Sequence, residues 1–167
     1  MIQVYTGNGK GKTTAALGLA LRAAGAGMQV YIGQFIKKGC YNELKALKKI
    51  KNIKVEQFGR GCFIKNKPSL KDMHSALKGL EKIRGAVSRR KFDLVILDEL
   101  NIAVKLKLVK ISDALSVIKS IPKKTELVIT GRYAHPQILK LADLVSEIKN
   151  RKHYFKRGIK SRKGIEF

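Results

Sequence analysis

The segment Thr6–Thr14, with the sequence Thr-Gly-Asn-Gly-Lys-Gly-Lys-Thr-Thr, constrains the fold of this chain most strongly. It lies between an apolar run, Ile2–Thr6, that is typical of a buried strand and a run of small helix-forming residues, Thr13–Ala26. A glycine-rich turn between a strand and a helix is the context of a phosphate-binding loop. The segment therefore predicts a site for the phosphates of a nucleotide, and the alternative is a glycine-rich turn without a ligand.

Each residue type of this loop has a physical role in such a site. Glycines at positions 7, 9 and 11 allow positive φ angles, so successive N–H groups can turn inward beside the helix N-terminus. Lys12 is expected to reach the terminal phosphates, and the Thr13 hydroxyl is expected to ligate Mg²⁺. A strict P-loop would have a glycine where Thr6 stands, and the three closely spaced glycines can compensate. The predicted ATP-binding set is Gly7, Asn8, Gly9, Lys10, Gly11, Lys12, Thr13 and Thr14.

A second half of a nucleotide site follows the apolar run Phe92–Leu97. Asp98 and Glu99 end this run, and a carboxylate in that position holds Mg²⁺ directly or through water in P-loop proteins. By itself the run could be a buried strand that ends in a solvated acid pair. Together with the glycine loop, it predicts a bound Mg-nucleoside triphosphate.

The alternation of apolar runs with helix-period stretches predicts parallel β-α-β units. We expect an α/β protein with a three-layer P-loop (RecA-like) fold, a mainly parallel central sheet and a single domain over residues 1–167. Ser69 and Asp72 resemble a capping box before a long amphipathic helix. The expected strands are 2–6, 29–36, 53–58, 93–98, 126–130 and 144–148, and the expected helices are 13–26, 69–87, 111–121 and one that opens at Pro136.

The net charge of +24, from 36 basic and 12 acidic residues, attracts polyphosphates of any kind. The chain has no tryptophan and no recognisable RNA- or DNA-binding module. We therefore expect that nucleic acid is not required for its function. No apolar run is long enough to span a membrane, no secretory signal is evident, and Cys40 and Cys62 form no metal or redox motif. These features favour a cytoplasmic protein without a membrane partner.

The residues alone leave more than one use of the nucleotide open. A small RecA-like ATPase, with or without nucleic acid, could orient water with Glu99 and stabilise charge with Arg132. A transferase would instead use the nucleotide as a substrate, and a regulator would bind it without chemistry.

The sequence resembles the P-loop type of ATP:corrinoid adenosyltransferase, also called cob(I)alamin adenosyltransferase. The resemblance runs along the whole chain and includes the unusual Thr-Gly start of the loop and the C-terminal motifs. The matching segments are 4–16, 34–37, 97–100, 129–132, 141–147, 158–160 and 163–167.

This resemblance implies that the Co(I) centre of a reduced corrinoid attacks the 5′ carbon of ATP, so that inorganic triphosphate leaves. Lys12, Thr13 and Glu99 would then be the catalytic residues, since the cofactor supplies the nucleophile and the protein supplies position and charge. The Mg²⁺ ligands would be Thr13, Asp98 and Glu99. The product would be an adenosylcobalamin-type cofactor, and the preferred corrinoid stays open.

The corrinoid side departs from the family pattern. The family has an aromatic pair in the loop after the third strand that displaces the lower axial ligand of cobalt. This chain has Cys62, Phe63 and Ile64 there, so apolar bulk or a shifted Phe63 would have to serve. The alternative is a simple turn at the end of a strand. We also expect Arg132 near the corrinoid, a reductant such as a flavoprotein, and a homodimer.

Overall fold

The computed structural model describes residues 1–39, 41–61, 68–88 and 91–166. Its centre is one six-stranded sheet with the order β3-β2-β4-β5-β1-β6, in which every pair of neighbouring strands is parallel. The predicted α/β fold with a parallel central sheet is therefore confirmed. The strands are β1 (Ile2–Thr6), β2 (Val30–Gln34), β3 (Ile53–Gln57), β4 (Leu94–Asp98), β5 (Glu126–Thr130) and β6 (Leu144–Glu147).

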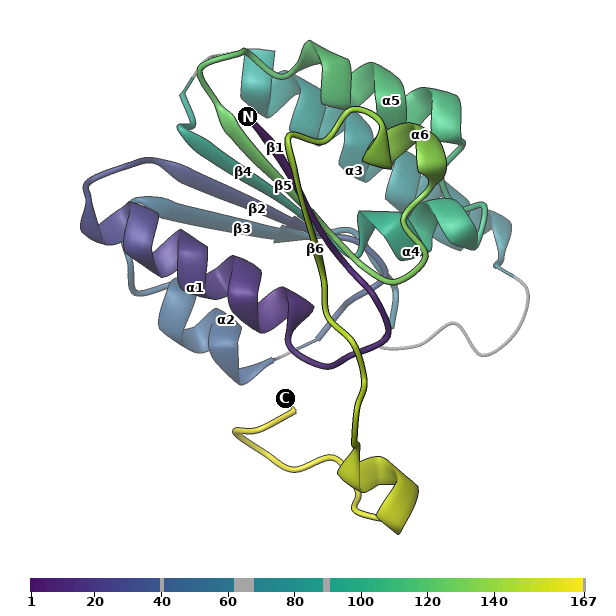
Figure 1. Ribbon diagram of the computed structural model, residues 1–167. Coiled ribbons are helices and arrows are strands. Elements are labelled where there is room, and N and C mark those ends of the chain that lie inside the picture. Colours follow the sequence, from purple (N-terminus) through teal and green to yellow (C-terminus); the bar gives the residue numbers. More distant parts are fainter. Residues whose placement is uncertain (40, 62–67, 89–90, 167) are drawn as a thin grey trace.

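Helices cover both faces of this sheet, which gives the three layers (Figure 1). One face carries α1 and α2, and the other carries α3, α4, α5 and α6. The helical elements are α1 (Lys12–Gly25), α2 (Asn42–Leu47), α3 (Leu70–Ser88), α4 (Leu100–Lys105), α5 (Ile111–Ser120), α6 (Pro136–Leu139) and a 3₁₀ turn, η1 (Tyr154–Arg157).

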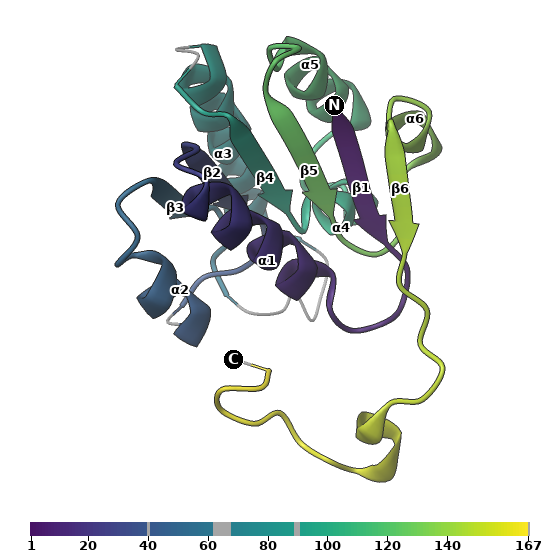
Figure 2. The same ribbon diagram turned by 60° about the vertical axis from the view of Figure 1, so that its left-hand side comes forward.

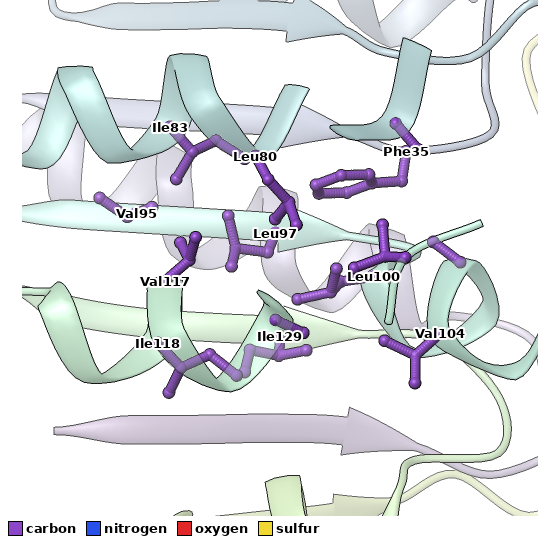
Figure 3. Packing of buried hydrophobic residues seen from close by; sticks show 14 of the residues in the cluster. Phe35, Leu80, Ile83, Val95, Leu97, Leu100, Val104, Val117, Ile118 and Ile129 are labelled. Atoms are coloured by element: carbon purple, nitrogen blue, oxygen red, sulfur yellow. The ribbon is translucent and has the colours of Figure 1, made fainter. Parts of the chain in front are cut away.

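The position of strand β4 between two layers of helices explains why its sequence is almost continuously apolar. Val95 and Leu97 face the cluster beneath α3 and α5, whereas Leu94 and Ile96 face the cluster beneath α1. Figure 3 shows Val95 and Leu97 packed against Leu80 and Ile83 of α3. Because successive side chains of a strand point to opposite faces, a strand with helices on both sides needs apolar residues at every position.

Two short helices were not expected from the sequence. Helix α2 lies in the lysine-rich stretch after β2, and only Leu44 and Leu47 of it are buried. Helix α4 begins directly after Glu99, which adopts a left-handed conformation with φ 61°. Each helix has six residues, which is too short for a helical period to stand out from its surroundings.

The strand order places the functional segments at one edge of the sheet. The glycine loop follows β1, the acid pair lies at the end of β4, and β5 lies between these two strands. Ligands of open parallel sheets bind at the carboxyl ends of the strands, which is the edge where these segments meet. In Figure 2 the chain leaves β6 at this same edge and turns back toward the start of α1.

Among the described residues, no helix is both long and apolar enough to cross a membrane.

Candidate active site

The three glycines of the loop meet two different structural needs. Gly7 and Gly11 have φ angles of 94° and 116°, a region that favours glycine. Gly9 has no positive φ, so the expectation of positive φ at all three positions is wrong there. Its N–H instead donates to the carbonyl of Ile148 at 2.6 Å, and a Cβ on Gly9 would lie 2.7 Å from that oxygen. Gly9 is therefore needed for the close approach of the segment after β6.

Lys12 is the first residue of α1 and is buried inside its own loop. Its Nζ donates to the carbonyl oxygens of Gly7 at 2.8 Å and Gly9 at 2.6 Å. Burial lowers the pKa of Lys12, because the charged ammonium loses hydration. The loop thus holds a positive charge at the helix N-terminus, where anions are favoured.

Asp98, the last residue of β4, is the centre of the site's hydrogen-bond network and is buried. Its Oδ1 accepts from the hydroxyls of Thr13 at 2.9 Å and Thr130 at 2.7 Å. Its Oδ2 accepts from Gln34 Nε2 at 3.1 Å and from Lys37 Nζ at 2.9 Å. Four donors from different elements fix this carboxylate, so its orientation is set before any ligand binds.

Glu99 follows Asp98 in a left-handed conformation, which few residues other than glycine adopt. Its backbone N–H donates to the Thr130 hydroxyl at 3.0 Å. Burial raises the pKa of Glu99, and the neighbouring Asp98 raises it further, against the opposing charges of Lys37, Lys12 and Arg132. The structure therefore brings Glu99 into the same electrostatic environment as Lys12 and Asp98.

Three residues of this network, Gln34, Lys37 and Thr130, were not among the predicted site residues. Gln34 ends β2 and Thr130 ends β5, and Lys37 lies three residues beyond Gln34. A signal was available in the sequence, since polar residues at the carboxyl ends of predicted parallel strands gather at one edge. The strand order was needed to show which of them reach Asp98.

The other predicted residues lie in different places. Asn8 is exposed on the loop, Thr14 is exposed in the first turn of α1, and Arg132 is exposed just after β5. Cys62, Phe63 and Ile64, the predicted corrinoid contacts, lie outside the described residues.

Lys10 points to the C-terminal tail instead of the Asp98 network. Its Nζ donates to Tyr154 Oη at 2.6 Å and to Glu166 Oε1 at 2.7 Å. Glu166 also accepts from the Tyr154 hydroxyl and, at 2.6 Å, from the backbone N–H of Arg162. The tail is thereby joined to the glycine loop, which the sequence did not predict.

The oxygen donors near Asp98 fit a magnesium ion that arrives with a nucleotide. Mg²⁺ commonly takes one or two carboxylates together with substrate phosphates and water. Thr13, Asp98 and Glu99 supply such oxygens, and the Lys37 ammonium lies 3.1 Å from Thr13 Oγ1 and 2.9 Å from Asp98 Oδ2. A cation is thus already accommodated between these oxygens. Among the residues that the structure describes, no group of three or more His, Cys, Asp and Glu side chains could hold a metal ion.

Comparisons with known proteins agree with this geometry. The model of the family described as ATP:corrinoid adenosyltransferase BtuR/CobO/CobP matches residues 1–167. A corrinoid adenosyltransferase of Pseudomonas aeruginosa is 34% identical, over 100% of this chain and 83% of its own length. The corrinoid adenosyltransferase CobA of Salmonella typhimurium is also 34% identical, over 100% of this chain and 85% of its own length.

A solved structure supports the fold alone. The KaiC-like protein PH0186 of Pyrococcus horikoshii superposes with a TM-score of 0.55 over 91% of this chain and 73% of its own, at 14% identity.

Proposed function

The chain belongs to the ATP:corrinoid adenosyltransferase family, and we propose that it transfers the 5′-deoxyadenosyl group of Mg-ATP to the Co(I) centre of a corrinoid. The cobalt electron pair forms a bond to the 5′ carbon of ATP. The bond between that carbon and the triphosphate oxygen breaks, and its electron pair leaves with inorganic triphosphate. The protein must therefore stabilise negative charge that gathers on the leaving group.

The observation that carries this proposal is the buried Lys12 at the N-terminus of α1, directly beside the Thr13–Asp98 pair. The loop amides, the helix terminus and the Lys12 ammonium would together stabilise the negative charge of a bound triphosphate. One preorganised donor of this kind is typically worth about 3–4 kcal/mol in the transition state. The reaction needs no nucleophile from the protein, because the corrinoid supplies it.

The magnesium ion would be held by the Thr13 hydroxyl and Glu99, with Asp98 beside them. Asp98 accepts a hydrogen bond from Thr13 at 2.9 Å, so it orients the hydroxyl lone pairs of Thr13. When bound, the ion neutralises part of the triphosphate charge. Removal of the Thr13 hydroxyl would therefore weaken both metal binding and the departure of triphosphate.

The corrinoid is proposed to contact Arg132 and the segment Cys62–Ile64, on the basis of the resemblance. Gly59 lies three residues before that segment, and its N–H donates to the carbonyl of Lys37 at 3.2 Å. The loop after β3 therefore begins beside the element that reaches Asp98. We further propose that the chain acts as a single domain and a homodimer, and that a reductant such as a flavoprotein delivers Co(I).

The test is an anaerobic incubation of the protein with Mg-ATP and chemically reduced cobalamin. Adenosylcobalamin is followed by its absorption spectrum, and the phosphate products are separated by ion-exchange chromatography. We expect one triphosphate for each cobalt–carbon bond formed. Orthophosphate without a cobalt–carbon product would refute the proposal and favour the ATPase.

Two substitutions at one position connect this activity with the site. Thr13→Val removes the hydroxyl and keeps the side-chain volume, so we expect a loss of about 100-fold or more in the rate of transfer. Thr13→Ser keeps the hydroxyl and serves as the matched control, with activity within a few-fold of the original protein. Equal activity of the two variants would show that the hydroxyl does not take part.

A further inference from the structure

The ammonium group of Lys37 lies between two of the three side chains proposed to hold the metal, Thr13 and Asp98. Its Nζ is 2.9 Å from Asp98 Oδ2 and 3.1 Å from Thr13 Oγ1. The Lys37 side chain is 17% exposed and that of Asp98 is 1% exposed, so the ion pair is largely removed from water. The Coulomb attraction within a pair in this environment is stronger than that of an ion pair on the surface.

An unusual backbone conformation holds Lys37 in this position. Ile36 has a φ of 66°, which is rare for a β-branched residue. The Lys37 N–H donates to the carbonyl of Phe35 at 2.7 Å, so the chain turns sharply as it leaves β2. Gly59 packs against this turn so closely that a Cβ there would lie 2.1 Å from the Ile36 carbonyl. The Lys37–Phe35 hydrogen bond and the close contact with Gly59 thus fix the turn. Backbone strain of this kind commonly accompanies function.

The lysine of the phosphate loop does not perform this task. Lys12 donates to the carbonyls of Gly7 and Gly9, whereas the ammonium hydrogen-bonded to Asp98 belongs to Lys37. The two lysines therefore bind different parts of the site, and only Lys37 pairs with a carboxylate. A divalent cation that binds Thr13 beside Asp98 would compete with the Lys37 ammonium for the same oxygens, because two positive charges at that distance repel each other.

We propose that the Lys37 ammonium occupies the metal position of the nucleotide-free protein. A divalent cation that binds with ATP displaces this ammonium. This inference rests on the proposed function for the identity of the metal site. It goes further because it makes Lys37 a competitor of the metal and a positioning residue for Asp98. After displacement, the fixed turn keeps the ammonium within reach of the phosphate loop, where it adds to the positive charge that faces the triphosphate.

The experiment measures binding of Mn²⁺ in the absence of nucleotide, by electron paramagnetic resonance of the free ion. Lys37→Met removes the competing charge and keeps the length of the side chain. We expect this variant to bind Mn²⁺ at least about tenfold more tightly than the original protein, since loss of one charged hydrogen bond corresponds to about that factor. The matched control is Lys54→Met, which also removes one ammonium, that of the exposed pair with Glu56 at 2.8 Å. Its Mn²⁺ affinity should be unchanged.

A second substitution locates the ion. In the double variant Lys37→Met with Asp98→Asn, the gain in Mn²⁺ affinity should disappear. The proposal is overturned if Lys37→Met binds Mn²⁺ no more tightly than Lys54→Met, or if the gain survives the loss of the Asp98 carboxylate.

Thermal unfolding provides a readout that needs no catalysis. Lys37→Met leaves the buried Asp98 carboxylate without its ammonium, so it should melt at a lower temperature in EDTA and recover in Mn²⁺. The original protein should show a much smaller shift with Mn²⁺. If Lys37→Met does not fold, Lys37→Gln keeps a hydrogen-bond donor for Asp98, removes the charge and carries the same expectations. Since none of these measurements involves a corrinoid, failure of adenosyl transfer and failure of this proposal are distinguishable.

Discussion

Thr130 connects the two acids of the candidate site through a single hydroxyl. Its Oγ1 donates to Asp98 Oδ1 at 2.7 Å and accepts from the backbone N–H of Glu99 at 3.0 Å. The side chain is fully buried at the end of β5, the strand between the phosphate loop and the acid pair. Thr130→Val keeps the shape and removes both hydrogen bonds, whereas Thr130→Ser keeps the hydroxyl and removes one methyl group.

The hydrogen bonds and the burial of Thr130 determine how much unfolding free energy each substitution should cost. A hydrogen bond to a carboxylate contributes about 1.5–3 kcal/mol, and a buried amide left without a partner costs about 1–3 kcal/mol. Asp98 keeps three other donors and Glu99 is only partly buried, so we expect Thr130→Val to lose about 3 kcal/mol of unfolding free energy. Thr130→Ser loses one buried methyl group, which amounts to about 1 kcal/mol.

Urea unfolding followed by circular dichroism measures both variants against the original protein. For a chain of this length, a loss of about 3 kcal/mol also lowers the melting temperature by roughly 6–12 °C. The Val variant should be the less stable of the two by about 2 kcal/mol. If the Val and Ser variants have the same unfolding free energy, the hydroxyl does not hold the acid pair and the reasoning is wrong.

Three further predictions concern the loop, a helix terminus and the tail. Lys12→Ala should abolish ATP binding in calorimetry without changing the circular dichroism spectrum, and unimpaired binding would show that the loop is misassigned. Ser69→Ala removes the N-cap of α3, whose hydroxyl accepts from the Asp72 N–H at 3.2 Å, so urea unfolding should show a loss of about 1 kcal/mol. The third prediction depends on Lys10, which, with Tyr154, holds the pKa of Glu166 below its ordinary value of 4.5. Attachment of the tail should therefore be complete above about pH 4.5 and weaken as the pH falls below it. Over that range, amide hydrogen exchange of residues 158–166 should be faster than the intrinsic pH dependence of exchange predicts. Glu166→Gln should remove this difference.

Most elements of the fold followed from local patterns. The strands β1 and β5 have the predicted bounds, and α3 and α5 follow the predicted apolar periodicity. The capping box at Ser69 is confirmed, since Ser69 and Asp72 exchange the expected hydrogen bonds. These features depend on residues within a few positions of one another, and a sequence displays such neighbours directly.

The end of β2 shows where local patterns stop being sufficient. The apolar run predicted a strand through Ile36, but β2 ends at Gln34. Ile36 instead adopts a left-handed conformation against Gly59, which arrives from the far end of β3. Strand propensity favours Ile36 in the sheet, and the tertiary contact with Gly59 overrides it.

The sequence by itself determined the phosphate loop, the acid pair after β4, the layered parallel fold and the family, because each depends on short segments in order along the chain. Only the tertiary structure decided what surrounds Asp98. Thr13, Lys37 and Thr130 are separated from Asp98 by 85, 61 and 32 residues. The strand order of the sheet brings these residues together, and their charge and hydrogen bonding can be worked out only once that order is known.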